Sequence, residues 1–258
     1  MPVHPWNFLG VRSSQNSPTS ETPRKGNEQM SKSELRLALE AAIDERHCAD
    51  HPMWDKLAAG ELGRKACMGW AVEHFHWISN MLAEATFQIC SKAPPDVIEL
   101  ELANFHEEED PDEPHMEIVL QFAEANGADI NAVKKGEGLP TTRSWAAWLN
   151  NVARIAPWYC GIAALRIGTE SQSPRLYSRV LPSLRNNYKY DEEAIKHFWL
   201  HSEVDIEHSD RGFEVLDRHC TTPEMKEAAI HYAWESARMR WFYFDGIYLH
   251  YEQGYALQ

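Results

Sequence analysis

The chain has 258 residues, a formal net charge of −14 and 43% hydrophobic residues. A single core can be buried at this length, so one large domain is expected. The negative charge argues against nucleic acid or an anionic membrane surface as a partner. No apolar run approaches the ~20 residues of a membrane-spanning helix. The five cysteines lack C-x-x-C spacing, which is typical of reduced thiols in a cytoplasmic protein.

Residues 1–30 are rich in Ser, Pro, Asn and Gln and have no helical periodicity. This composition predicts a disordered N-terminal tail. Ser31 and Glu34 then form a capping box, which predicts the start of the first helix. Residues 31–258 are therefore expected to form one helical domain.

Apolar residues recur at helical intervals along the rest of the chain, and no sustained alternation predicts a strand. We therefore expect an all-α fold with about seven helices. Thr141 or Thr142 is expected to cap one long helix, which Pro157 should kink. The expected helices span approximately 31–47, 62–90, 95–105, 115–125, 141–169, 174–186, 192–219 and 223–252.

The helix expected at 192–219 carries His201, Asp205 and His208, an H-x3-D-x2-H spacing. At ~100° per residue, the second and third side chains lie at about 40° and −20° from the first. Two imidazoles and a carboxylate on one narrow face suit a divalent iron, manganese or zinc ion. The apolar residues that flank the triplet argue against a fully solvated face. This pattern therefore predicts a metal site.

Further ligands must come from elsewhere, and an acidic residue three positions before a His is common in this chain. A ferritin-like bundle uses repeated E-x-x-H together with lone glutamates. That interpretation fits poorly, because one of the two candidate pairs carries Asp in place of Glu and the other glutamates are badly spaced. The four such pairs are Asp44/His47, Glu73/His76, Asp112/His115 and Asp205/His208.

A different order of residues matches better. Asn104 and two glutamates precede a His that opens the next helix, and a lone glutamate comes before H-x3-D-x2-H. This order resembles the haem-oxygenase-like diiron oxidases and oxygenases, which share an all-α fold with thiaminase II and pyrroloquinoline quinone synthase. The resemblance implies a haem-oxygenase-like bundle for residues 31–258. It implies as metal ligands Glu108, His115, Glu170, His201, Asp205 and His208.

One departure from the family leaves the acidic ligand open. Many members have glycines between the acidic pair and the His, whereas this chain has further acidic residues and two prolines. Glu107 or Glu109 therefore stays open as a replacement for Glu108. Arg166 and Arg175 lie near the lone glutamate in sequence and are candidates to anchor a substrate carboxylate.

The resemblance also implies a chemistry. Two Fe(II) ions per chain and O2 as co-substrate would oxidise a small metabolite, such as an amino acid or a fatty acid, by desaturation, C–C cleavage or N-oxygenation. Three carboxylates would set −3 against the +4 of two ferrous ions, and manganese stays open as the metal. The expected partner is a small-molecule substrate, with no nucleic acid and no membrane. Proteins of this fold are often homodimers, so a homodimer is open by analogy.

Three alternatives remain at this stage. A metal-free cofactor-synthesis oxidase or a thiaminase-like enzyme could use the same fold, the latter with Cys67 or Cys160 as nucleophile. A non-catalytic helical protein could bind iron for structure or storage. A mononuclear iron or manganese site is the third. Convergence of all six proposed ligands would favour the diiron hypothesis.

Overall fold

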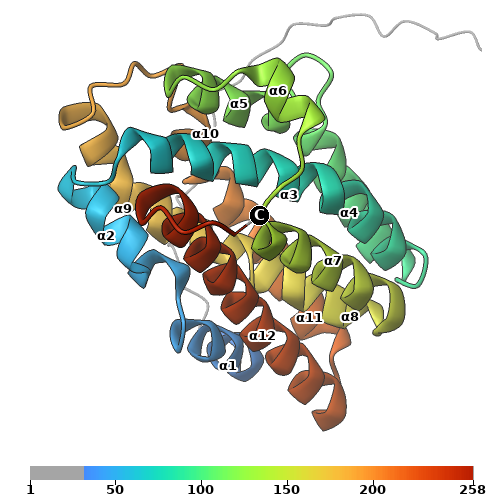
Figure 1. The fold of residues 1–258 in the computed structure, drawn as a ribbon. Coiled ribbons are helices and arrows are strands. Elements are labelled where there is room, and N and C mark those ends of the chain that lie inside the picture. The colour runs from blue at the N-terminus through green and yellow to red at the C-terminus, as the bar shows by residue number, and fades with distance from the viewer. Residues whose placement is uncertain (1–31, 258) are drawn as a thin grey trace, which may run out of the picture. The chain divides into compact units, whose positions relative to one another are not determined.

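The structure, a computed structural model, describes residues 32–257, and their regular elements are all helical (Figure 1). The expected all-α class is therefore confirmed, whereas the expected tail at 1–30 lies outside the described residues. The expected capping box of Ser31 and Glu34 is wrong, because Ser33 is the N-cap of the first helix and its hydroxyl accepts a hydrogen bond from the backbone N–H of Arg36. The α-helices are α1 (Glu34–Asp44), α2 (Pro52–Ala59), α3 (Arg64–Cys90), α4 (Pro95–Glu108), α5 (His115–Ala125), α6 (Ile130–Lys135), α7 (Pro140–Ile155), α8 (Trp158–Ile162), α9 (Ser173–Asn186), α10 (Lys196–His201), α11 (Val204–His219) and α12 (Pro223–Ile247). Short 3-10 and π turns are η1 (Cys48–Asp50), η2 (Ala163–Ile167), η3 (Glu170–Gln172) and η4 (Tyr248–Glu252).

Helix α3 crosses the middle of the domain and packs against α5 and α7, which lie above and below it in Figure 1. It is apolar around most of its circumference, as expected for a helix with neighbours on several sides. Trp77 of α3 stacks on Trp145 of α7 with ring centroids 4.2 Å apart. Truncation of a large buried aromatic residue such as Trp145 typically costs about 3–5 kcal/mol. The aromatic residues of the sequence thus form the core that positions the surrounding helices.

Several predicted helix starts are confirmed. Helix α5 begins at His115, directly after Pro114. Helix α12 begins at Pro223, where the Thr222 side chain accepts a hydrogen bond from the backbone N–H of Met225. Pro223 is at the first helical position of α12, where a proline loses no intrahelical hydrogen bond, whereas Pro114 is the N-cap of α5.

The single helix expected at 141–169 is wrong. Helix α7 ends at Ile155, and Pro157 starts the separate helix α8, because proline has no N–H and its ring clashes with the preceding turn. The predicted cap is also wrong: Leu139 is the N-cap, and Thr142 instead donates a hydrogen bond to the buried carboxylate of Glu73, 2.5 Å away. The π turn η2 follows α8, and such turns are common at functional sites.

The single helix expected at 192–219 is wrong as well. It is divided into α10, which ends at His201, and α11, which begins at Val204. At the division, the hydroxyl of Ser202 donates to the carbonyl of Trp199 at 2.7 Å. A serine side chain competes in this way with the helical backbone hydrogen bonds. His201 therefore lies on a different helix from the other two residues of its motif.

Two other expectations can be compared with the described residues. All five cysteines are free, which agrees with the predicted thiols. No described helix has both the length and the apolarity needed to cross a bilayer.

Candidate metal centre

The six residues implied by the resemblance meet inside the bundle. Glu108 ends α4, His115 begins α5, and Glu170 begins η3. His201 ends α10, and Asp205 and His208 lie in the first turns of α11. The side chains of all six are at least 85% buried. Three carboxylates gathered in a protein interior are costly unless cations neutralise them.

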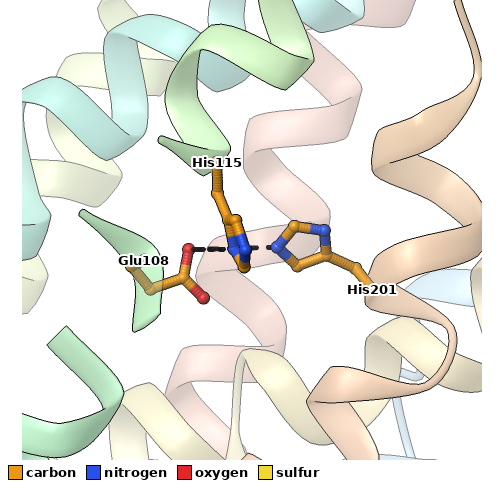
Figure 2. A group of neighbouring side chains, drawn as sticks. All are labelled: Glu108, His115 and His201. Carbon is orange, nitrogen blue, oxygen red and sulfur yellow. Dashed lines mark hydrogen bonds and ion pairs between the residues drawn. The ribbon is translucent and has the colours of Figure 1, made fainter. Parts of the chain in front are cut away.

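Glu108 lies at the centre of the group. Its Oε2 is 2.9 Å from Nδ1 of His115 and 3.9 Å from Nε2 of His201 (Figure 2). Its Oε1 is 3.8 Å from Nδ1 of His208. Two triplets of closely spaced ligand atoms therefore share this carboxylate: one adds His115 and His201, the other Asp205 and His208. A carboxylate that bridges two metal ions needs this arrangement of one oxygen toward each triplet.

Glu170 lies beside the second triplet and adds a fourth ligand group to it. Its Oε2 lies 3.9 Å from Nδ1 of His208. Both atoms are buried, and neither has a hydrogen-bond partner among the described residues. Orphaned buried polar atoms are rare because each has lost its hydration without compensation. Their separation suits two ligands at ~2.1 Å from one ion, so this donor set fits a divalent metal.

A buried ion pair holds Glu170 in place. The guanidinium of Arg166 contacts both carboxylate oxygens of Glu101, at 3.0 and 2.9 Å, and Oε1 of Glu170 at 2.5 Å. The side chains of Arg166 and Glu101 are fully buried. Only Oε2 of Glu170 is therefore left for a metal. Glu101 could have been suspected from the sequence, because it lies two helical turns before Glu108 on the same face of α4.

The two arginines suggested as substrate anchors do not serve that purpose in this structure. Arg166 is occupied by its two carboxylate partners. Arg175 has a half-exposed side chain and pairs with Asp50 at 2.7 Å. Proximity in sequence to Glu170 gave no information about where these long side chains end.

Glu107 and Glu109 are the two alternatives to Glu108 that the sequence leaves open. Glu109 is exposed. Glu107 approaches His208 from the opposite side, with its Oε2 2.9 Å from Nε2 of that imidazole. The guanidinium of Arg211 lies 3.3 Å from the other oxygen of Glu107. Glu107 therefore orients the His208 ring so that Nδ1 faces the other ligands.

Burial and mutual charge shift the acid–base equilibria of the group. Burial raises the pKa of Glu170 to about 7 and also raises the pKa of Asp205. Burial opposes ionisation of Glu108, but the imidazoles of His115 and His201 hold its pKa well below the usual range. For His201, burial lowers the pKa, and the carboxylates of Asp205 and Glu108 outweigh it, raising the pKa to about 9. The metal-free group thus retains protons that a bound cation would displace.

A cavity of about 50 Å³ adjoins the ligands. On one side α3 contributes mainly apolar side chains, and on the other lie polar groups of η3, α9 and α12. Its lining residues are His74, Trp77, Ile78, Met81, Leu82, Glu108, Thr169, Glu170, Ser173, Tyr177, His201, Asp205 and Arg240.

Sequence reasoning missed His197 and Tyr177. The ring of His197 stacks on His201 with centroids 4.1 Å apart, and the Tyr177 hydroxyl lies 3.3 Å from Nε2 of His197. Both lie in or beside apolar helical faces, which gave no signal of a site.

Glu73 and His76 lie outside the ligand group, so the ferritin-like arrangement does not form. Glu73 is buried and accepts hydrogen bonds from the N–H of Leu139 at 2.7 Å and the hydroxyl of Tyr251 at 2.9 Å. His74, in contrast, lines the cavity.

Comparisons with known proteins give the family. The family described as iron-containing redox enzyme matches residues 70–241. The chain is 25% identical to 4-aminobenzoate synthase of Nitrosomonas europaea over 235 residues, which cover 86% of this chain and 94% of that protein. It is 23% identical to pyrroloquinoline-quinone synthase of a Bradyrhizobium strain over 230 residues, which cover 86% and 87%.

Solved structures agree in fold. A protein with a haem-oxygenase-like fold from Shewanella denitrificans has a TM-score of 0.71 and 17% identity, covering 87% of this chain and 96% of that one. A TenA homologue from Pseudomonas syringae also has a TM-score of 0.71, with 9% identity and coverage of 83% and 90%. The chain therefore belongs to the haem-oxygenase-like family of iron-containing redox enzymes.

Proposed function

We propose that the protein is a non-haem diiron oxidase or oxygenase that uses O2 to oxidise a small metabolite. The observation that carries this proposal is the position of Glu108, with one carboxylate oxygen toward each of two ligand triplets. The orphaned Oε2 of Glu170 and Nδ1 of His208 support it. Membership of a family of iron-containing redox enzymes agrees with it.

Under this proposal, His115, His201 and Glu108 hold one Fe(II). Asp205, His208 and Glu170 hold the second, with Glu108 shared. Six protein ligands leave positions open on both ions, as a catalytic site requires. When bound, the two ferrous ions supply electrons that reduce O2. Manganese at one position remains an alternative occupant of the same ligands.

The protein's own groups prepare the site. Arg166 limits Glu170 to one free oxygen, and Glu107 fixes the orientation of His208. The apolar side chains of Ile78 and Met81 border the cavity and exclude bulk water. A dry cavity strengthens every electrostatic interaction inside it.

The relatives indicate the kind of substrate. One is named for the synthesis of 4-aminobenzoate, an aromatic carboxylate, and another for the synthesis of a quinone cofactor. We infer that this chain acts on a small molecule in the biosynthesis of a cofactor or a related metabolite. A cytoplasmic location and a homodimeric state belong to the same proposal.

A metal-free oxidase is the second candidate. The similarity to pyrroloquinoline-quinone synthase favours it, as does the direct 2.9 Å contact between Glu108 and His115. A thiaminase-like mechanism is less well supported. Burial raises the pKa of the Cys67 and Cys160 thiols to about 12, and no cysteine among residues 32–257 lines the cavity. Thiols of such high pKa are poor nucleophiles at neutral pH.

Oxygen uptake distinguishes the candidates. Metal-stripped protein is loaded anaerobically with Fe(II), and O2 consumption is then followed with an electrode. We expect rapid uptake of about one O2 per two bound Fe(II), which Asp205→Asn should abolish. Asp210→Asn is the matched control, because that carboxylate is on the same helix and pairs with Arg36 at the surface. Uptake no faster than that of free Fe(II) would contradict the diiron proposal, and chelator-resistant oxidation would favour the metal-free candidate.

A further inference from the structure

Arg240 of α12 is a buried cation that has no carboxylate partner. Its side chain lines the cavity beside the metal ligands and is only 2% exposed. One terminal nitrogen donates to the backbone carbonyl of Thr169, and the other donates to the hydroxyl of Ser173 at 3.1 Å. Its Nε has no partner among the described residues, and no described carboxylate lies within ion-pair distance of it, although the charge of Asp205 acts on it from farther away. Arg166, another arginine beside the ligands, has two such partners.

An unpaired guanidinium in a protein interior requires explanation. Arginine keeps its charge at any accessible pH, so it cannot escape burial by losing a proton. Removing such a cation from water without a counter-charge costs several kcal/mol in general. Asp205 is a proposed metal ligand, so a bound ion would offset its charge and leave Arg240 without compensation. A bound anion would then supply the counter-charge, and the free Nε is a donor left for it.

The charge of the whole site points the same way. Its buried ionic side chains comprise two guanidiniums, Arg166 and Arg240, and four carboxylates, so they sum to −2. With the imidazoles neutral, two bound ferrous ions would bring the net charge of the site to +2. One or more anionic ligands are then needed to approach neutrality. The four carboxylates are Glu101, Glu108, Glu170 and Asp205.

We propose that Arg240 anchors the carboxylate group of the substrate, which makes the substrate a small organic acid. The proposal rests on the proposed function in taking the metal cavity as the substrate site. A planar guanidinium matches a carboxylate better than any other side chain does, and the hydroxyl of Ser173 lies beside it.

The size of the cavity limits what enters first. About 50 Å³ accommodates a carboxylate group and little more. The remainder of the substrate would lie against Ile78, Met81 and Leu82 on the α3 side. Methionine has three rotatable bonds and adapts readily to a new neighbour, so this wall can yield to an apolar or aromatic body. Amides and cations of the same shape would leave Arg240 unpaired.

A purely structural role for Arg240 makes a different prediction. Its bonds to Thr169 and Ser173 tie α12 to the segment that carries Glu170. If that were its whole role, replacing it would change stability without changing the preference for an acid over an amide.

The test compares binding of benzoate and benzamide to the full chain by anaerobic calorimetry, with Fe(II) present and with metal removed. Wild-type, iron-loaded protein should bind benzoate about 10- to 100-fold more tightly than benzamide, the range for one charged hydrogen-bonded pair. Arg240→Gln should reduce this ratio to near one. Arg238→Gln is the matched control, because that residue is on the same helix but pairs with Glu45 at the surface.

Each outcome decides the matter. Equal binding of the two probes by the wild type, or an unchanged ratio in folded Arg240→Gln, overturns the proposal. If circular dichroism shows that Arg240→Gln does not fold, Arg240→Lys takes its place: its point charge should lose about tenfold of the preference, and an unchanged ratio overturns the proposal. An Arg240-dependent preference in a chain that binds no iron would uphold the anchor while refuting the diiron function. Iron binding without a preference for benzoate over benzamide would refute the anchor and uphold the binding of iron.

Discussion

Replacing Arg166 with methionine tests the electrostatic support of the site. Among residues 32–257, Arg166 is the only cation that contacts the fully buried Glu101, and its replacement also removes three hydrogen bonds. Deleting one partner of a buried ion pair typically costs about 3–5 kcal/mol, because the other charge stays buried and uncompensated. We therefore expect Arg166→Met to lower the free energy of unfolding by about that amount.

The double variant Arg166→Met/Glu101→Leu removes both charges. It should be more stable than Arg166→Met alone, because no unpaired charge is left at position 101 and Glu170 can take up a proton. The exposed pair of Arg238 and Glu45 is the control, and Arg238→Met should cost less than about 1 kcal/mol. Urea unfolding of metal-free protein at pH 7, followed by circular dichroism, measures the free energy of unfolding of the wild type and of each variant. A cost below about 1 kcal/mol for Arg166→Met, or additive effects in the double variant, would refute the reasoning.

Three further predictions concern single residues. Glu107→Gln removes the charged acceptor of His208 Nε2. The affinity for iron, measured in competition with a chelating dye, should fall about 10- to 100-fold. An affinity equal to that of the wild type would show that Glu107 does not orient His208. Burial, aided by two arginines, lowers the pKa of His47 to about 4. The stability that neutral His47 contributes should therefore be complete above about pH 6.5 and lost as the pH falls through 4. His47→Asn should flatten this pH dependence of the free energy of unfolding, measured in urea. Gly246→Ala places a Cβ against Thr141 and should cost about 1–3 kcal/mol by urea unfolding, partly relieved by Thr141→Ala.

The all-α class and several helix bounds could be predicted because they depend on local signals. The expected helices at 115–125 and 223–252 begin where α5 and α12 begin, because Pro114 and Pro223 act within a residue of their own position. Proline also marked the end of α7, but the depth of that break was underestimated. The division between His201 and Val204 could not be predicted, since it contains neither proline nor glycine.

The candidate ligands could be predicted only through the resemblance to a family. His201 and His208 form a recognisable spacing, whereas Glu170 stands alone in a segment without any local pattern. The supporting residues escaped detection for a physical reason. Arg166 reaches Glu101 on α4 and Arg240 reaches Ser173 on α9 through the ends of long side chains, and both partners are distant in sequence.

The most direct test of the account is the number of irons bound by two variants. Because Glu108 is shared between the triplets, Glu108→Ala should bind neither Fe(II) tightly. His115 belongs to one triplet only, so His115→Ala should retain about one tightly bound Fe(II) per chain, against two in the wild type. Anaerobic Fe(II) titration with a metal count after gel filtration measures this. Equal counts in the two variants, or a wild type that retains no iron, would contradict the account.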